Sequence, residues 1–292
     1  MTGPVPLGWI GIARLGLVQT ALGAIVVLTT STINRVMVVE LALPAMLPGA
    51  LVALHYAVQI LRPRWGHGSD RGGRRTGWIV GGMAVLAAGG TAAAVATAIM
   101  AQRPVLGAFL AVLAFLMVGI GVGASGTNLL ALLATRVAPG RRAPAATIVW
   151  LMMIAGFVVT ATIAGRFLDP FSGERLIIVT ATVSVLALCL TILAVWGLEG
   201  RGISPARTET QRTVRFGEAL REVWAETESR RFTIFIFVSM LAYSAQDLVL
   251  EPFAGAVFGM TPGQSTQLAG VQHGGVFLGM IVVALAGAGI GG

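Results

Sequence analysis

The chain carries little charge for its length. Only 11% of its 292 residues are Asp, Glu, Lys or Arg, while 56% are hydrophobic, and a typical soluble domain has about 25% charged residues. The mean hydropathy of +0.86 points the same way. This composition excludes an ordinary soluble domain and predicts an all-α polytopic membrane protein.

Lysine is absent and cysteine occurs once, which excludes several kinds of chemistry. All 20 basic residues are arginines, so no lysine can form a Schiff base. Cys189 lies inside an apolar run and can neither form an internal disulfide nor complete a metal site. The sequence also shows no nucleotide loop, metal-spaced His/Cys cluster or catalytic triad. We therefore expect neither an enzyme nor a bound metal.

The net charge of +8 does not indicate a nucleic-acid partner, because the arginines cluster in short loops between apolar runs. Windows of about 20 apolar residues cross a bilayer, and the chain offers eight candidates, so membrane lipid is the expected surrounding. The eight candidate spans cover 15–33, 47–61, 77–101, 106–133, 145–165, 176–196, 232–250 and 268–290.

The arginines are divided unequally between the two sides of these spans, which predicts the topology. Four fall on one side, namely Arg35, Arg103, Arg166 and Arg175, and the others fall on the opposite side. Because cytoplasmic loops are rich in arginine, we expect the N-terminus to be cytoplasmic. Arg14 precedes a run without a small-residue cleavage site, so the first span is expected to be retained.

A basic, glycine-rich loop lies between the second and third predicted spans. Residues 66–75 read GHGSDRGGRR, which resembles the corresponding loop of the major facilitator superfamily. Glycines allow two helix ends to approach, and a carboxylate there can pair with arginine or cap a helix. The alternative is an ordinary positive-inside loop. We expect the loop to act as a structural gate between the helices. Its expected members are Gly66, Asp70, Arg71, Gly73, Arg74 and Arg75.

Six spans, a long polar stretch and two more spans predict the domain organisation of that superfamily. The expected parts are a six-helix membrane domain at 1–200, a cytoplasmic linker at 201–231 and the start of a second membrane domain at 232–292. MLPG at 46–49 is echoed by MTPG at 260–263, as expected of parallel repeats. Because a full second repeat needs about four more spans, we expect a truncated or partial sequence.

Two smaller patterns leave alternatives open. Within the linker, Phe216, Leu220, Val223 and Trp224 fall on one helical face, which predicts an amphipathic surface helix that acts as a strap between domains or as a docking site. In the fourth span, small residues at positions 119, 123 and 126 allow close helix packing or leave a groove for a flat ligand.

Polar residues near the spans are the candidate site. One group lies at the end of the first span and the other at the matching end of the seventh, where the charges either brace the two halves or have a function. Those groups are Asn34, Arg35 and Glu40, and Gln246, Asp247 and Glu251.

Two histidines lie on repeat-related spans. His55 and His273 follow the glycines of the two repeated segments by six and ten residues, a difference of one helical turn. A neutral imidazole can ligate a metal, including the magnesium of a porphyrin-like ring, or carry protons. The alternative is a hydrogen-bonded interior histidine.

Several of these runs are similar to the PucC/LhaA bacteriochlorophyll delivery family of the major facilitator superfamily. The similar runs are TINRVMVVE at 32–40, ALHY at 53–56, SDR at 69–71, SMLAYSAQDLVLEPF at 239–253 and STQLAGVQHGG at 265–275. The resemblance implies a non-enzymatic factor in a bacterial inner or intracytoplasmic photosynthetic membrane. It would assist assembly of light-harvesting complexes by binding bacteriochlorophyll or handing it to antenna polypeptides. With the histidine pattern, the resemblance makes His55, His273 and the two polar groups candidate pigment-binding residues.

A secondary transporter of a small amphipathic solute, working by alternating access, is the competing hypothesis. The fourth span lacks the internal arginine of proton-coupled relatives, and the fifth lacks the proline-glycine pattern of many antiporters. Drug-proton exchange is therefore the less favoured form of transport.

Overall fold

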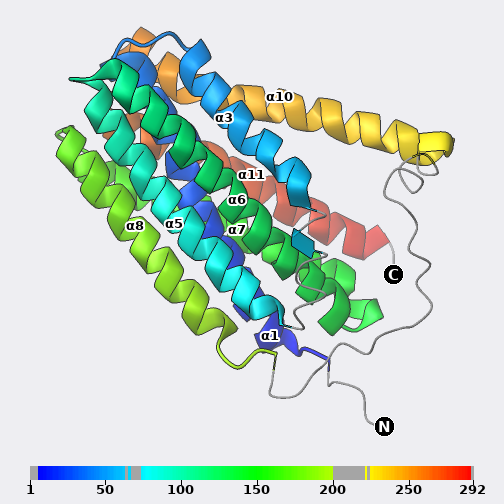
Figure 1. The fold of residues 1–292 in the computed structure, drawn as a ribbon. Helices are drawn as coiled ribbons and strands as arrows, with labels where there is room; N and C mark the ends of the chain where they lie inside the picture. Colours follow the sequence, from blue (N-terminus) through cyan, green and yellow to red (C-terminus); the bar gives the residue numbers. More distant parts are fainter. Residues whose placement is uncertain (1–5, 63–64, 67–73, 200–220, 222–223, 291–292) are drawn as a thin grey trace.

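The computed structural model describes residues 6–62, 65–66, 74–199, 221 and 224–290, and the described ranges contain helices and no strand. Figure 1 shows the helices running roughly side by side along one axis, with α10 inclined away from the rest. The elements are α1 (Trp9–Val27), η1 (Leu28–Thr32), α2 (Ile33–Arg35), η2 (Val36–Glu40), α3 (Met46–Val58), η3 (Gln59–Leu61), α5 (Arg75–Met100), α6 (Pro104–Arg136), η4 (Pro139–Arg141), α7 (Arg142–Phe167), α8 (Gly173–Val195), α10 (Thr227–Phe258) and α11 (Pro262–Ile290).

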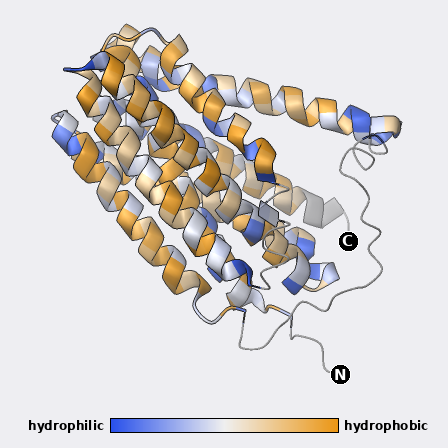
Figure 2. Cartoon of the chain, in the orientation of Figure 1, coloured by the Kyte–Doolittle hydropathy of each residue, from blue (hydrophilic) through white to orange (hydrophobic). Residues whose placement is uncertain are grey.

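The all-α polytopic membrane architecture is confirmed. Within the described residues, seven helices are long and apolar enough to cross a membrane, and each overlaps most of one predicted window. The remaining window corresponds to the shorter apolar helix Met46–Leu61. Figure 2 shows apolar residues along the helices and hydrophilic residues gathered towards several helix ends, including the start of α10.

The first span is longer than predicted because its helix does not stop at the polar residues. Trp9–Glu40 is one continuous helix of 32 residues in which η1 and η2 are π-helical segments on either side of the short α2. A π-turn changes the direction in which the following side chains point and is frequent at functional sites. In this helix the two π-segments bracket Asn34 and Arg35, which are both buried.

The helix α1 forms the centre of the bundle. It packs mainly against α7 and α8, while α5 packs against α6 and α8. A core cluster joins these helices through fully buried side chains such as Leu15, Met83, Val118 and Val149. The outer faces of α6, α7 and α8 are apolar and exposed, as expected of helices surrounded by lipid.

The last two helices are attached to the bundle differently. Helix α11 packs along α7, whereas α10 contributes only Glu251, Ala254 and Gly255 as buried residues. Figure 1 accordingly shows α10 meeting the bundle near its C-terminal end and diverging towards its start. Contact between the first six predicted spans and the last two is thus concentrated on α7 and on the end of the first span.

Close approach of α7 and α11 depends on two glycines. A Cβ on Gly165 would lie 2.7 Å from the carbonyl oxygen of Gly263, and a Cβ on Gly263 would collide with the carbonyl oxygen of Gly165. Separations under 3.0 Å force the backbones apart, so only glycine fits at this crossing.

We expect Gly165→Ala to destabilise the packing of α11 on α7 by about 1–3 kcal/mol, because the new methyl overpacks a backbone contact. The measurement is the thermal unfolding of the detergent-solubilised protein. Gly81→Ala is the matched control, since nothing lies within 4 Å of a Cβ there. Equal unfolding temperatures for both variants would contradict the inferred contact.

At the end of the bundle where α1 begins, Glu199 caps helix α5. Its carboxylate accepts hydrogen bonds from the backbone N–H groups of Arg75 and Thr76, each at 2.9 Å, and from the Thr76 hydroxyl at 2.6 Å. Burial raises the pKa of Glu199, but these hydrogen bonds and the nearby charge of Arg74 outweigh it and hold the pKa below its ordinary value of 4.5. The cap thus joins the end of α8 to the start of α5.

Because the folded pKa of Glu199 is depressed, the cap should stabilise the protein fully above pH 4.5 and lose that contribution as the pH falls through the folded pKa. We expect Glu199→Gln to lower the unfolding temperature at pH 7 and to flatten its dependence on pH below 4.5. Thermal unfolding from pH 3 to pH 7 measures both effects. An unchanged pH profile in the variant would show that the carboxylate does not act as the cap.

Candidate functional site

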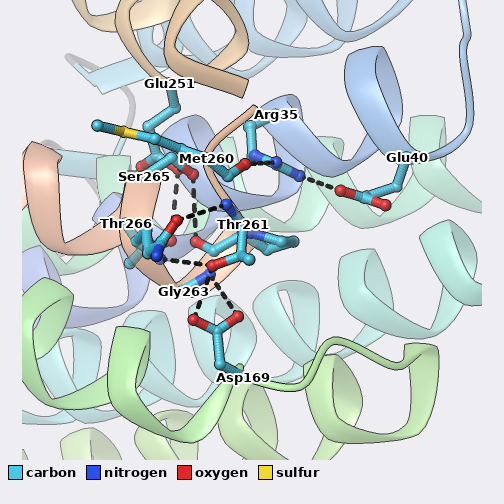
Figure 3. Close-up of polar contacts among 11 residues, drawn as sticks. Arg35, Glu40, Asp169, Glu251, Met260, Thr261, Gly263, Ser265 and Thr266 are labelled. Atoms are coloured by element: carbon cyan, nitrogen blue, oxygen red, sulfur yellow. Dashed lines mark hydrogen bonds and ion pairs between the residues drawn. The ribbon is translucent and has the colours of Figure 1, made fainter. Parts of the chain in front are cut away.

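A buried carboxylate lies where the first span meets α10 and α11. Glu251 is completely buried. It accepts a hydrogen bond from the Ser31 hydroxyl at 2.6 Å. It also accepts hydrogen bonds from the hydroxyls of Ser265 and Thr266, each at 3.3 Å (Figure 3). The three donors come from η1 and α11, while the acceptor belongs to α10. One side chain therefore ties three separate elements together.

A buried arginine lies beside this carboxylate. Arg35 is 1% exposed and forms an ion pair with Glu40 at 2.6 Å. It also donates a hydrogen bond to the carbonyl oxygen of Met260, in the turn between α10 and α11, as Figure 3 shows. Its guanidinium lies against Gly255, where a Cβ would come within 2.9 Å of Nη2. Glycine at this position of α10 thus makes room for the cation.

Two further contacts fasten the same end of the bundle. Asn34 donates a hydrogen bond to the carbonyl oxygen of Leu248 at 2.8 Å. Asp169, in the turn between α7 and α8, accepts hydrogen bonds from the Thr261 hydroxyl at 2.7 Å and from the backbone N–H of Gly263 at 3.3 Å (Figure 3). A carboxylate at a helix N-terminus satisfies free N–H groups and complements the helix dipole. Asp169 therefore anchors the start of α11 to the bundle.

Local sequence explains why α10 and α11 meet at this point. Gly259 adopts a left-handed conformation with φ of 64°, which ends α10. Pro262 begins α11, and proline is favoured in the first turn because its missing N–H would have no helical partner. The predicted positions of the two repeated segments are confirmed, because MLPG begins α3 and MTPG lies at the start of α11.

A second polar cluster lies on the same helices, further from this end. On α10, Tyr243 and Asp247 precede Glu251 by eight and four residues, or about 12 Å and 6 Å along the axis. Gln272 donates a hydrogen bond to Asp247 at 2.9 Å, and Tyr56 of α3 is within electrostatic range of Asp247. Both tyrosines of the chain thus lie near one carboxylate.

The two predicted histidines are both buried, and their ring nitrogens differ in availability. In His55, Nε2 bonds the side chain of Gln59 at 3.0 Å, and Nδ1 is buried without a partner among the described residues. In His273, Nδ1 lies 3.4 Å from the Tyr243 hydroxyl, and the ring lies 4.9 Å from that of Phe157. An axial ligand needs a free ring nitrogen that faces open space. Among the described residues, no hydrogen bond engages Nε2 of His273, whereas the one unpartnered ring nitrogen of His55, Nδ1, is fully buried.

The structure brings most, but not all, of the predicted site residues together. The first cluster contains Asn34, Arg35, Glu40 and Glu251, and the second contains Asp247 and His273, whereas Gln246 is exposed on α10. In the predicted loop, Gly66 is helical, Arg74 precedes α5 and Arg75 begins it. Asp70, Arg71 and Gly73 lie outside the described residues, as do Phe216, Leu220 and Val223 of the predicted amphipathic helix.

Sequence reasoning missed the neutral partners of the charged residues. Ser31, Ser265 and Thr266 complete the environment of Glu251, and Tyr243 orients His273. Hydroxyl residues are common in membrane helices, so the only available signal was their spacing of a few residues from a predicted charge. Among the described residues, no group of three or more His, Cys, Asp or Glu side chains could hold a metal ion.

The comparison with protein families decides the classification. The family described as "PUCC protein" matches residues 32–291, a range that includes all residues of both polar clusters except Ser31. The chain belongs to this family. The resemblance read from the sequence is therefore confirmed for nearly the whole chain.

Individual members of the family are similar to this chain over most of its length. It is 57% identical over 284 residues to the "Bacteriochlorophyll synthase 44.5 kDa chain" of Rhodobacter capsulatus, covering 97% of this chain and 66% of the relative. It is 32% identical over 279 residues to "Protein PucC" of Cereibacter sphaeroides, covering 91% of this chain and 60% of the relative. The chain thus spans less than two thirds of the length of these curated relatives.

Proposed function

We propose that this protein is a light-harvesting complex assembly factor that binds bacteriochlorophyll and delivers it to antenna polypeptides. The observation that supports this most is the 57% identity to a relative whose name refers to bacteriochlorophyll. Family membership and the multi-pass membrane architecture agree with such a role. The protein acts on pigment by holding it and not by enzymatic chemistry.

The polar cluster on α3, α10 and α11 is the place where we expect the pigment to bind. A chlorin ring needs an axial ligand for its magnesium and apolar walls for its faces, and a neutral imidazole can provide the ligand. His273 offers Nε2 while the Tyr243 hydroxyl engages Nδ1, an arrangement that fixes the ring orientation of a ligating histidine. Phe157 provides an aromatic wall beside it.

The test is the absorption spectrum of the full chain purified from a pigmented membrane. The proposal expects bound bacteriochlorophyll in a fixed ratio to protein, and antenna polypeptides recovered in a pulldown under mild detergent. A colourless preparation that recovers no antenna polypeptide would overturn it. Protein expressed in a host that makes no bacteriochlorophyll, then mixed with the pigment, separates weak retention from absence of binding.

We propose further that the helices belong to a major facilitator fold in the bacterial inner or intracytoplasmic photosynthetic membrane, with the N-terminus in the cytoplasm. The arginine-rich side of the spans supports this orientation. In a Cys189→Ser background, a cysteine placed at Thr208 should resist an impermeant thiol reagent added outside intact cells and react after permeabilisation. Efficient labelling from outside would reverse the topology.

Secondary transport is the second candidate function, and the buried Glu251 favours it. Ionisable residues inside a membrane domain often carry protons or face a substrate path, and Glu251 joins elements that come from both predicted halves. Transport and pigment binding can be told apart by experiment. A transporter moves solute across proteoliposomes, whereas an assembly factor binds pigment without net movement.

A further inference from the structure

A pocket of about 480 Å³ lies between the first half of α5 and α6, and it shares no residue with the two polar clusters. This volume is within the range of sites that hold small molecules. Its lining follows α5 from Arg74 to Val85, which is about 16 Å along a helix axis. Figure 1 shows α5 beside α6, with the start of α5 at the end of the bundle where α1 begins. The pocket therefore starts at a helix end and runs towards the middle of the span.

Two tryptophans line this pocket. Trp65 lies against Gly123 of α6, where a Cβ would overlap the indole ring, so protein covers part of the small-residue face predicted on that helix. Trp78 of α5 is 37% exposed. Neither indole N–H has a hydrogen-bond partner among the described residues. Tryptophan is enriched at the depth of lipid headgroups, where the ring is in an apolar layer and the N–H meets polar groups.

The outer end of the pocket has a positive charge without a partner. Arg74 lines the pocket and is exposed, and no hydrogen bond or ion pair joins it to any described residue. Glu199 is close enough to feel this charge, but its carboxylate oxygens already accept hydrogen bonds from Arg75 and Thr76. No acidic residue lines the pocket itself. The charge of Arg74 is thus available to an anion.

The pocket becomes apolar and stays open further along α5. Gly77 and Gly81 line it, and nothing lies within 4 Å of a Cβ built on either residue. Close helix packing, which explains glycine at Gly82, where a Cβ would lie 2.5 Å from the backbone of α6, is therefore absent at these two positions. Val85 and Ile120 complete the inner part of the lining. The pocket thus combines a cationic end with an apolar channel.

We propose that this pocket binds one anionic phospholipid, with Arg74 pairing with the phosphate, the two indole N–H groups donating to headgroup or ester oxygens, and an acyl chain lying along Gly81 and Val85. Arginines beside membrane spans attract anionic headgroups. A zwitterionic headgroup finds no carboxylate in the lining for its ammonium group. Free phosphate would leave the apolar channel unused. The site is separate from that of His273 and goes beyond the function proposed above.

Native mass spectrometry of the full chain tests this site without pigment. The protein is produced in a host that makes no bacteriochlorophyll, stripped of lipid in detergent, and titrated with dioleoyl phosphatidylglycerol or dioleoyl phosphatidylcholine. We expect phosphatidylglycerol to saturate at one tightly held molecule per chain and phosphatidylcholine to add without saturation. Inorganic phosphate at millimolar concentration, the third arm, should not displace the bound phosphatidylglycerol.

Two pairs of variants test the lining. Arg74→Gln should weaken phosphatidylglycerol binding about fivefold, whereas Arg141→Gln, which removes an exposed arginine from the turn between α6 and α7, should leave it unchanged. Gly81→Leu should fill the channel and abolish saturation. Gly279→Leu is its control, because Gly279 of α11 has equally open space around a Cβ and does not line the pocket.

Three outcomes overturn the proposal. Equal retention of phosphatidylglycerol and phosphatidylcholine would show that only ordinary bilayer lipid fills the pocket. Equal weakening in Arg74→Gln and Arg141→Gln would show a general attraction to the basic surface and no site. Displacement by inorganic phosphate would assign the cationic end to a free anion. Because Arg74→Gln changes an exposed side chain, the test remains decisive if Gly81→Leu fails to fold.

Discussion

Protein carrying His273→Leu should copurify with about one tenth of the bacteriochlorophyll that the unsubstituted chain retains, a loss equivalent to about 1.4 kcal/mol of binding free energy. Leucine keeps an apolar, helix-compatible side chain but removes the ring nitrogen. The pigment that remains should absorb at a shifted wavelength because its axial ligand is gone. Absorbance of the purified protein, normalised to protein concentration, measures both effects.

His55→Leu is the matched control, because Gln59 already engages Nε2 of His55 and Nδ1 is buried. We expect this variant to retain most of its pigment. Tyr243→Phe removes the hydroxyl partner of His273 and should weaken pigment binding less than loss of the imidazole does. Wild-type amounts of pigment at unshifted absorption in His55→Leu, His273→Leu and the double variant would assign both histidines to the core.

Glu251→Ala should lower the stability of the protein by about 3 kcal/mol, because it removes a buried acceptor that three hydroxyls share, leaves the Ser31 hydroxyl without its partner and opens a cavity. The affected donors are those of Ser31, Ser265 and Thr266. For a chain of this size the loss corresponds to a decrease in unfolding temperature of about 10 °C. Thermal unfolding in detergent measures the change.

Glu251→Gln separates the role of the hydrogen bonds from that of the charge. Glutamine keeps one acceptor oxygen in the same place, so most of the stability should return. Glu228→Ala is the control for loss of a carboxylate on α10, since the Glu228 side chain is 85% exposed and should leave the unfolding temperature unchanged. If all three variants unfold together, Glu251 does not hold α10 against the first span.

Helix boundaries show where sequence reasoning succeeded and where it failed. The window predicted at 77–101 matches α5 (Arg75–Met100) closely, because Arg74 and Arg75 precede a continuous apolar run and a polar turn follows it. The first span was predicted to end at 33 but continues to Glu40. Hydropathy falls at Asn34 and Arg35, but the backbone remains helical because both side chains find partners on α10, Glu40 and the following turn.

In the candidate site, charged residues within the spans could be predicted from the sequence, whereas a charged residue in a turn could not. Arg35 and Glu251 could be singled out from the sequence, because charge within an apolar run is rare and costly. Asp169 could not, because an acid in a turn between spans has nothing unusual about it. Only its position beside the start of α11 makes it part of the junction.

The sequence by itself determined the class of the protein, the number and approximate place of its helices, and its family. These properties follow from apolar run length and from local residue patterns, which the chain carries whatever its neighbours are. The tertiary structure alone decided which polar residues meet. Ser31 and Glu251 are 220 residues apart in the chain, and helix packing sets both that contact and the separate environments of His55 and His273.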